Sequence, residues 1–150
     1  MKEEYFESVQ SLERLHRLFL DVVRSELDNM GIFDINNVQA IIVYNIGTSQ
    51  LSVGELTNRG YYLGSNVSYN LRKMVKHEYV VQVPTPHDRR SSLVKLSPKG
   101  MDLYKNLDKV FQKHGEVLNS KGGKETLTQL SGSLQKLERF WNEVISKDGR

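Results

Sequence analysis

Residues 65–77, SNVSYNLRKMVKH, determine how the rest of the chain is interpreted. At about 3.6 residues per turn this stretch forms a helix with two unlike faces. The apolar face predicts a core contact and carries Val67, Leu71, Met74 and Val75. The opposite face is polar and cationic, lacks any carboxylate, and carries Ser65, Asn66, Tyr69, Arg72, Lys73 and Lys76, with Ser68 at its edge. Such a face suits the approach to a polyanion, and a solvated surface helix is the alternative that this segment alone leaves open.

The residues before this helix predict a shorter helix and a tight turn. Ser52 and Glu55 have the spacing of a capping box, in which each side chain satisfies a backbone amide at a helix start. The short helix is expected to end before Gly60, and residues 61–64 connect it to the basic helix. A short helix, a four-residue turn and a second helix form a helix-turn-helix arrangement.

The residues after the helix predict a β-hairpin with a cationic tip. Residues 79–83 and 92–96 are rich in β-branched side chains and are typical of strands, and Pro84 and Pro86 are expected to end the first strand. The tip contains Asp88, Arg89 and Arg90. Arginine suits a narrow minor groove because the negative potential is enhanced there, whereas Asp88 is expected to hold a neighbouring arginine. The hairpin is therefore interpreted as a wing, with solvated charge as the other interpretation of the arginine pair.

Amphipathic helices are predicted on both sides of this core. Their apolar residues recur at three- and four-residue spacing, and they cover residues 3–29, 37–46, 98–118 and 124–145. Asn36 and Ser97 are expected to cap two of them, and Gly47 to end the second. The fold class is therefore mainly α with a small β-hairpin (α+β). A first helix this long often packs against a partner chain, with packing inside one chain as the alternative.

The charge of the chain is concentrated in its middle. Residues 52–99 carry eight cations against three anions, a net charge of +5, whereas the other residues have a net charge of −2 and the whole chain +3. The eight cations are Arg59, Arg72, Lys73, Lys76, Arg89, Arg90, Lys95 and Lys99. A basic middle between mildly acidic flanks indicates a module that faces a polyanion.

Catalytic and metal-binding functions have no support in the sequence. The chain has no cysteine, which excludes disulfides, thiolate metal sites and thiol redox sensing. The four histidines, His16, His77, His87 and His114, show no metal-ligand spacing. No nucleophile elbow or paired-carboxylate motif is present, so we expect neither an enzyme, nor a metal, nor a cofactor. The acidic start, MKEEYFESVQ, does not resemble an export signal, and we expect a cytoplasmic protein.

Residues 51–100, LSVGELTNRGYYLGSNVSYNLRKMVKHEYVVQVPTPHDRRSSLVKLSPKG, resemble the winged helix-turn-helix core of the MarR family of bacterial transcriptional regulators. The pattern Asp88-x-Arg90-x-x-x-Val94-x-Leu96-Ser97 is similar to the wing signature of that family, with Ser97 where threonine is commoner. The resemblance implies one domain over residues 1–150. Within it, residues 36–97 would be the DNA-binding region, and residues 1–30 and 98–150 would be dimerisation helices.

The resemblance also implies a homodimer on a pseudo-palindromic DNA operator, with two major-groove contacts about 34 Å apart. It implies that base edges and nearby phosphates are contacted by Ser65, Asn66, Ser68, Tyr69 and Arg72. Arg72 would pair with guanine and Asn66 with adenine. Phosphates would be contacted by Lys73, Lys76 and Ser52. Arg90, with Arg89 beside it, would enter the minor groove.

Two questions stay open at this point. Many members of the resembled family bind small aromatic or amphipathic effectors, and His16, Phe19 and Tyr44 are candidates to line such a site, with ordinary core packing as the alternative. The second question is the partner of the basic face. A winged-helix module for protein assembly, without a specific DNA site, is the alternative to a DNA-binding regulator.

Overall fold

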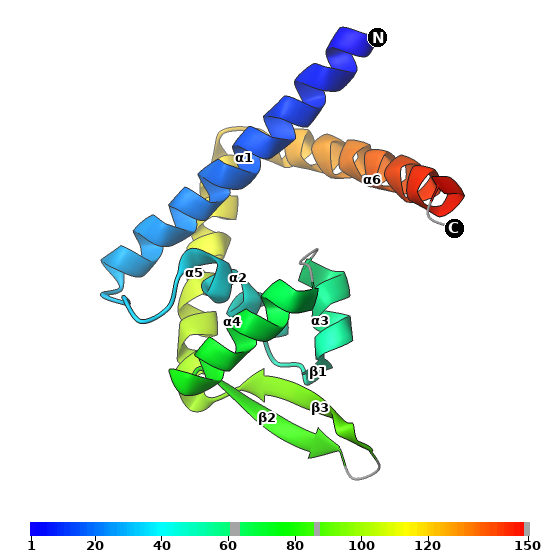
Figure 1. The fold of residues 1–150 in the computed structure, drawn as a ribbon. Helices are drawn as coiled ribbons and strands as arrows, with labels where there is room; N and C mark the ends of the chain where they lie inside the picture. Colours follow the sequence, from blue (N-terminus) through cyan, green and yellow to red (C-terminus); the bar gives the residue numbers. More distant parts are fainter. Residues whose placement is uncertain (61–63, 86–87, 149–150) are drawn as a thin grey trace. The chain divides into compact units, whose positions relative to one another are not determined.

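The computed structural model describes residues 1–60, 64–85 and 88–148, without the side chains of residues 60, 64, 65, 85, 88–91 and 148 (Figure 1). The elements are α1 (Lys2–Asn29), α2 (Asn37–Ile46), β1 (Leu51–Ser52), α3 (Val53–Gly60), α4 (Gly64–Lys76), β2 (Val80–Thr85), β3 (Asp88–Leu96), α5 (Pro98–Ser120) and α6 (Gly123–Asp148). They form two compact units, Met1–Asp108 and Lys109–Arg150, and α5 contributes to both. The mainly helical fold with a small sheet confirms the predicted fold class.

The first unit contains a three-stranded antiparallel sheet in the order β1-β3-β2. The long pairing is the hairpin of β2 and β3, which extends away from α4 (Figure 1). The sequence did not reveal β1, because a two-residue strand is too short to show an alternating pattern. It pairs Leu51 with Val94 and Ser52 with Leu93. This short strand attaches the start of α3 to the hairpin.

The expected end of the first strand at Pro84 was wrong. Strand β2 continues through Pro84, which pairs with Ser92, to Thr85, which pairs with Asp88. The register shifts between Pro84 and Thr85. A proline is tolerated here because β2 is the outermost strand, so the missing backbone N–H can fall on the side without a partner strand. Pro86 and His87 lie outside the described residues.

The core of the first unit lies between the helices and the sheet. Val67, Leu71 and Met74 on α4 are buried, as predicted, whereas Val75 is only half-buried. The other buried apolar residues include Val23 and Leu27 of α1, Ile42, Val43 and Ile46 of α2, Leu56 of α3, Val80, Val94 and Leu96 of the hairpin, and Leu103 and Leu107 of α5. Each fully buried aliphatic side chain contributes about 1.5–3 kcal/mol relative to an exposed one. The orientation of α4 is therefore fixed by its apolar face.

Three helix starts confirm their predicted caps. In α2, Gln39 N donates to Asn36 Oδ1 (2.8 Å) and Asn36 N donates to Gln39 Oε1 (3.0 Å), which completes a capping box. In α3, Glu55 N donates to Ser52 Oγ (3.1 Å), and Ser52 N lies 3.4 Å from the Glu55 carboxylate. In α5, Gly100 N donates to Ser97 Oγ (3.0 Å). Such caps typically contribute about 1 kcal/mol each.

The end of α4 is joined to the start of α5 through backbone contacts. Tyr79 N donates to Met74 O (2.9 Å) and Glu78 N donates to Val75 O (3.0 Å), which is the pattern of a Schellman motif. Glu78 has a φ of +68°, the left-handed conformation that this motif requires. Ser97 Oγ then donates to Glu78 O (2.5 Å), and Ser97 N donates to Tyr79 O (3.0 Å). Ser97, the residue before α5, thus holds the turn that follows α4 through these two hydrogen bonds.

The second unit consists of the C-terminal part of α5 and all of α6. Between residues 109 and 147 no side chain is buried, although apolar residues follow helical spacing throughout. Two helices that bury so little cannot form a core of their own. Within the described ranges, none of the helices combines the length and apolar character needed to cross a bilayer.

Candidate nucleic-acid interface

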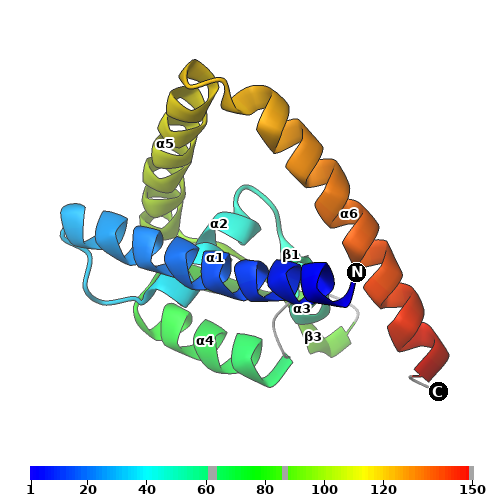
Figure 2. The same ribbon diagram turned by 90° about the horizontal axis from the view of Figure 1, so that it is seen from above.

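The outer face of α4 is exposed along its described length. Asn66, Arg72, Lys73 and Lys76 are exposed, Tyr69 is 51% exposed, and Ser68 is half-buried. In Figure 2 no other described segment of the first unit lies over this side of the helix. The predicted contact residues of α4 that the structure describes therefore share one solvent-facing surface, opposite Val67, Leu71 and Met74. The side chain of Ser65 lies outside the described residues.

Two of these residues interact with each other. The Lys73 ammonium lies over the ring of Tyr69, with Nζ 5.0 Å from the ring centre. A cation over an exposed aromatic ring gains about 0.5–1 kcal/mol, less than the roughly 2 kcal/mol of rotamer entropy that a lysine side chain carries. Tyr69 and Lys73 thus place an aromatic ring and a positive charge side by side, without fixing the lysine.

Ser52 lies at the start of α3, where helix amides attract anions. Its hydroxyl oxygen already accepts the Glu55 amide, so only the hydroxyl proton is available to a phosphate. The Glu55 carboxylate lies at the same helix start and weakens the attraction for a second anion. Ser52 is therefore suited to one directional contact with a phosphate and not to a strong anion site.

The predicted wing residues are only partly described. The backbone of Asp88, Arg89 and Arg90 lies in β3, at the end of the hairpin where Thr85 pairs with Asp88. The side chains of these three residues lie outside the described part of the structure. Their roles in holding an arginine or entering a minor groove remain predictions.

Sequence reasoning missed a polar contact behind the outer face of α4. Gln39 on α2 is 4% exposed, and its Nε2 donates to Asn70 Oδ1 (3.1 Å). Asn70 Nδ2 in turn donates to Asn66 O (2.9 Å), in the first turn of α4. The capping signal at Gln39 was visible in the sequence, but no local pattern reveals a second partner that is 31 residues away.

None of the three predicted effector residues lines either of the two hollows described below. His16 is exposed and Phe19 is 39% exposed on α1. Tyr44 is half-buried on α2, its hydroxyl donates to Asp108 Oδ1 (2.8 Å), and its ring centre lies 5.3 Å from that of Tyr104. Burial and the bond to Asp108 raise the pKa of Tyr44 to about 12. Tyr44 is thus engaged within the first unit.

A hollow of about 420 Å³ lies beside α1, and its lining residues on that helix are sequence neighbours of His16 and Phe19. Its lining consists of Arg14, Arg17, Leu18, Leu20, Asp21 and Asn37. Asn37 Nδ2 donates to Leu20 O (3.1 Å), which joins α2 to α1 at the edge of this hollow. The two arginines outnumber the one lining carboxylate, Asp21, and with their apolar neighbours they suit a ligand that carries both a carboxylate and a hydrophobic part.

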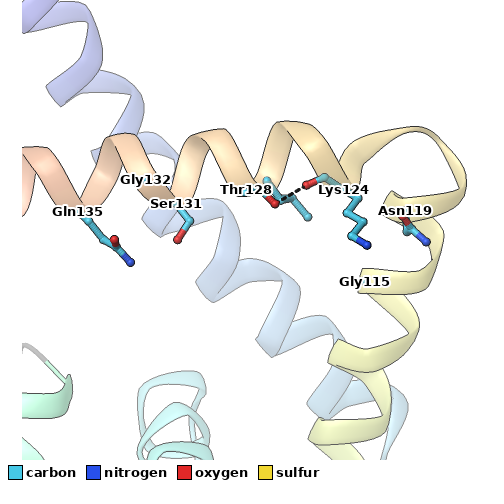
Figure 3. Close-up of a pocket in the computed structure, with 8 residues that line it drawn as sticks. Gly115, Asn119, Lys124, Thr128, Ser131, Gly132 and Gln135 are labelled. Atoms are coloured by element: carbon cyan, nitrogen blue, oxygen red, sulfur yellow. Dashed lines mark hydrogen bonds between the residues drawn. The ribbon is translucent and has the colours of Figure 1, made fainter.

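A second hollow, of about 530 Å³, lies within the Lys109–Arg150 unit (Figure 3). It is lined by Gly115, Asn119, Lys124, Leu127, Thr128, Ser131, Gly132 and Gln135. Thr128 Oγ1 donates to Lys124 O (3.0 Å), so its hydroxyl proton is used within α6.

Across the part of the chain that the structure describes, no cluster of three or more His, Asp or Glu side chains could hold a metal ion.

Comparison with known proteins gives the same interpretation of the fold. A family model described as a winged helix DNA-binding domain matches residues 35–100. The chain is 35% identical over 141 residues to the exopolysaccharide II synthesis transcriptional activator ExpG of Rhizobium meliloti (strain 1021), covering 93% of this chain and 73% of ExpG.

Solved structures extend the likeness to nearly the whole chain. FabT of Streptococcus pneumoniae in complex with DNA has a TM-score of 0.76 at 16% identity, covering 93% of this chain and 99% of FabT. A MarR transcriptional regulator from Methanosarcina mazei Go1 has a TM-score of 0.74 at 19% identity, covering 94% of this chain and 99% of that one.

Proposed function

The chain belongs to the MarR family of winged helix-turn-helix transcriptional regulators and is a DNA-binding regulator of transcription, and from this premise we propose that α4 reads the bases of a pseudo-palindromic operator in the major groove. The observation that carries this proposal is the exposed outer face of α4, where three cations and polar groups occur without a carboxylate. Approach to phosphates requires positive charge, and base recognition requires polar side chains that can reach base edges.

We assign the contacts by side-chain chemistry. Arg72 is suited to a bidentate contact with guanine, Asn66 to one with adenine, and Tyr69 to apolar contact or stacking. Lys73 and Lys76 are suited to phosphates, with Ser52 supplying a further phosphate contact. In the wing, Arg90 with Arg89 would enter the minor groove and Asp88 would orient one of them.

We further propose that the regulator is a homodimer, with one winged domain on each half of the operator. The second unit supports this, because none of residues 109–147 is buried and its apolar side chains need a partner. They include Val117, Leu118, Leu127, Leu130, Leu134, Phe140, Val144 and Ile145, all at least 37% exposed. On α1, Tyr5, Phe6, Leu15, Leu18, Phe19 and Val22 are also exposed. A second copy of the chain would cover these helices.

We propose that a small amphipathic anion regulates DNA binding from the hollow beside α1. Arg14 and Arg17 would bind its carboxylate, and Leu18 and Leu20 would contact its apolar part. His16 and Phe19, on the same helix, remain candidates to contact it when a second copy is present. Because the bacterial chromosome is the target, the regulator would act in the cytoplasm.

The experiment that tests the main proposal is selection of bound duplexes from a random library with the purified protein. The expected result is a single motif with two inverted half-sites about one helical turn apart. Sedimentation of the protein alone should give twice the chain mass. Enrichment of no motif, with binding that random competitor DNA abolishes, would instead favour the protein-assembly module.

Benzoate serves as a probe of the effector proposal. Its addition should weaken the binding of the wild-type protein to the operator more than it weakens the binding of the Arg17→Ala variant.

A further inference from the structure

A buried amide on α2 connects to the DNA-facing helix. Gln39 is 4% exposed, and its side chain uses both ends: Oε1 accepts the Asn36 backbone amide (3.0 Å) and Nε2 donates to Asn70 Oδ1 on α4 (3.1 Å). A buried polar group without partners is costly, so both bonds are needed for this side chain to lie where it does.

The two bonds of Gln39 have different chemical requirements. At the third position of a capping box the side chain only has to accept the N-cap amide, and glutamate does this as well as glutamine. The bond to Asn70 requires an N–H donor, which glutamate in its ionised form lacks. The cap therefore does not explain why an amide stands at this position, whereas the contact with α4 does.

Asn70 passes this contact to the part of α4 that faces DNA. Its Nδ2 donates to Asn66 O (2.9 Å), one helical turn earlier. Asn66 lies in the first turn of α4, where a recognition helix meets base edges. A continuous polar path thus runs from the start of α2 through Gln39 and Asn70 to the backbone of a proposed base-reading residue.

We propose that Gln39 is a positioning residue for sequence recognition, which sets the rotation and depth of α4 relative to α2 through Asn70 while touching no DNA itself. Apolar packing of Val67, Leu71 and Met74 holds α4 in place but tolerates small rotations, whereas a hydrogen bond between amides is directional. A rotation by a few degrees would displace the outer side chains by a large part of an ångström and would degrade bidentate base contacts before phosphate contacts. This inference depends on the proposed base-reading role of α4.

The test compares Gln39→Glu with Asn36→Ala in the full-length protein, on the selected operator and on a random duplex of equal length. Gln39→Glu retains the cap acceptor and removes the donor to Asn70. Asn36→Ala removes the cap and leaves the Gln39–Asn70 bond. We expect Gln39→Glu to lower the operator-to-random affinity ratio about tenfold, as one polar base contact would, with an unchanged salt slope. Asn36→Ala should lower the melting temperature and keep the ratio within about twofold of the wild type.

A double-variant cycle identifies the path. If Gln39 acts through Asn70, then Asn70→Ala lowers the ratio similarly and the combined variant loses no more than either one alone. Additive losses, or a Gln39→Glu ratio equal to that of the wild type, would overturn the inference. If Gln39→Glu does not fold, Gln39→Met is compared with Asn36→Ala in the same assay, because Met is similar in length and lacks the donor.

A separate pair of variants distinguishes this inference from the proposed function. Asn66→Ala and Arg72→Ala remove the proposed base contacts directly. If neither lowers the operator-to-random ratio, the base-reading role of α4 is wrong, and the positioning role fails with it. If both lower the ratio and Gln39→Glu does not, only the positioning role is wrong.

Discussion

The hydroxyl of Tyr79 donates a 2.6 Å hydrogen bond to Asp34 Oδ1, across 45 residues of sequence. Lys99 Nζ completes the arrangement, 2.8 Å from Asp34 Oδ2, 3.0 Å from His77 O and 4.3 Å from the centre of the Tyr79 ring. Three parts of the chain meet in these contacts: the segment between α1 and α2, the turn after α4, and the start of α5. They fix where α4 ends.

This arrangement should make stability depend on pH. Burial alone raises the pKa of Asp34, but the hydrogen bonds from Lys99 and Tyr79 and the charge of Lys99 outweigh it and lower the pKa below the ordinary 3.8. The stabilising contribution is therefore complete above 3.8 and is lost as pH falls through the lowered value. Burial and the bond to Asp34 raise the pKa of Tyr79, so its contribution is lost only in strong alkali.

We expect Asp34→Asn to lower the free energy of unfolding by about 1 kcal/mol at pH 7, because these side chains are partly exposed. The difference from the wild type should shrink as pH falls below 3.8. Urea unfolding at a series of pH values measures this. Asp102→Asn, which removes an exposed carboxylate on the same helix α5, is the control for the loss of one negative charge. A difference that stays constant with pH would rule out the ionised Asp34 as its source.

The positive φ of Glu78 predicts a stabilising substitution. A residue other than glycine at +68° bears strain from its Cβ, and glycine is the usual residue at this position of a Schellman motif. Glu78→Gly should raise the free energy of unfolding by about 0.5–1 kcal/mol, after the greater entropy of the unfolded glycine chain is allowed for. Thermal unfolding measures it. The matched control is Glu78→Ala, which removes the same charge and keeps the Cβ, and an equal gain from both variants would contradict the explanation.

Gly100 should not accept a side chain. A Cβ at this position would lie 2.1 Å from Tyr79 O and 3.3 Å from Leu96 Cβ. The closer of these atoms belongs to the backbone, which cannot easily move. We expect Gly100→Ala to lower the free energy of unfolding by about 3 kcal/mol. Gly54→Ala on α3 is the control, because its Cβ would meet only Ser52 Oγ at 3.9 Å. The better helix propensity of alanine should raise the free energy of unfolding by up to about 1 kcal/mol. Similar unfolding midpoints for the two variants would show that the turn at Tyr79 adapts.

Arg72 and Lys73 should differ in how they act on DNA. Arg72→Ala is expected to weaken operator binding by about 1–3 kcal/mol and to relax the base preference at one position. Lys73→Ala should weaken binding to all duplexes and lower the salt slope by about one. Titrations of the operator and of a random duplex at several salt concentrations separate the two. Equal losses on both duplexes for Arg72→Ala would remove it from the base-reading residues.

The helices could be predicted closely because their ends carry local signals. Asn36 and Ser97 cap helices that begin at the next residue, and Gly47 ends α2 where expected. The apolar face of α4 followed from spacing alone, and its core position is confirmed for Val67, Leu71 and Met74. These features depend on residues within one or two turns of each other, which is the range that a sequence pattern reports.

The contacts that join the elements could not be predicted in this way. Gln39 and Asn70 are 31 residues apart, and Asp34 and Lys99 are 65 residues apart. Their side chains are polar and would be assigned to the surface by composition. Only the fold brings them together. The short strand β1 was missed for a related reason, because its identity as a strand comes from its partner β3.

The position of Pro84 bears on whether another extended chain can add to the sheet. Strand β2 forms the outer edge of its sheet, where an incoming extended chain would normally add itself by hydrogen bonding. Proline has no backbone N–H to donate to such a chain, and the register shift beside it makes this edge irregular. The proline and the register shift together disfavour the addition of another strand at this edge of the sheet.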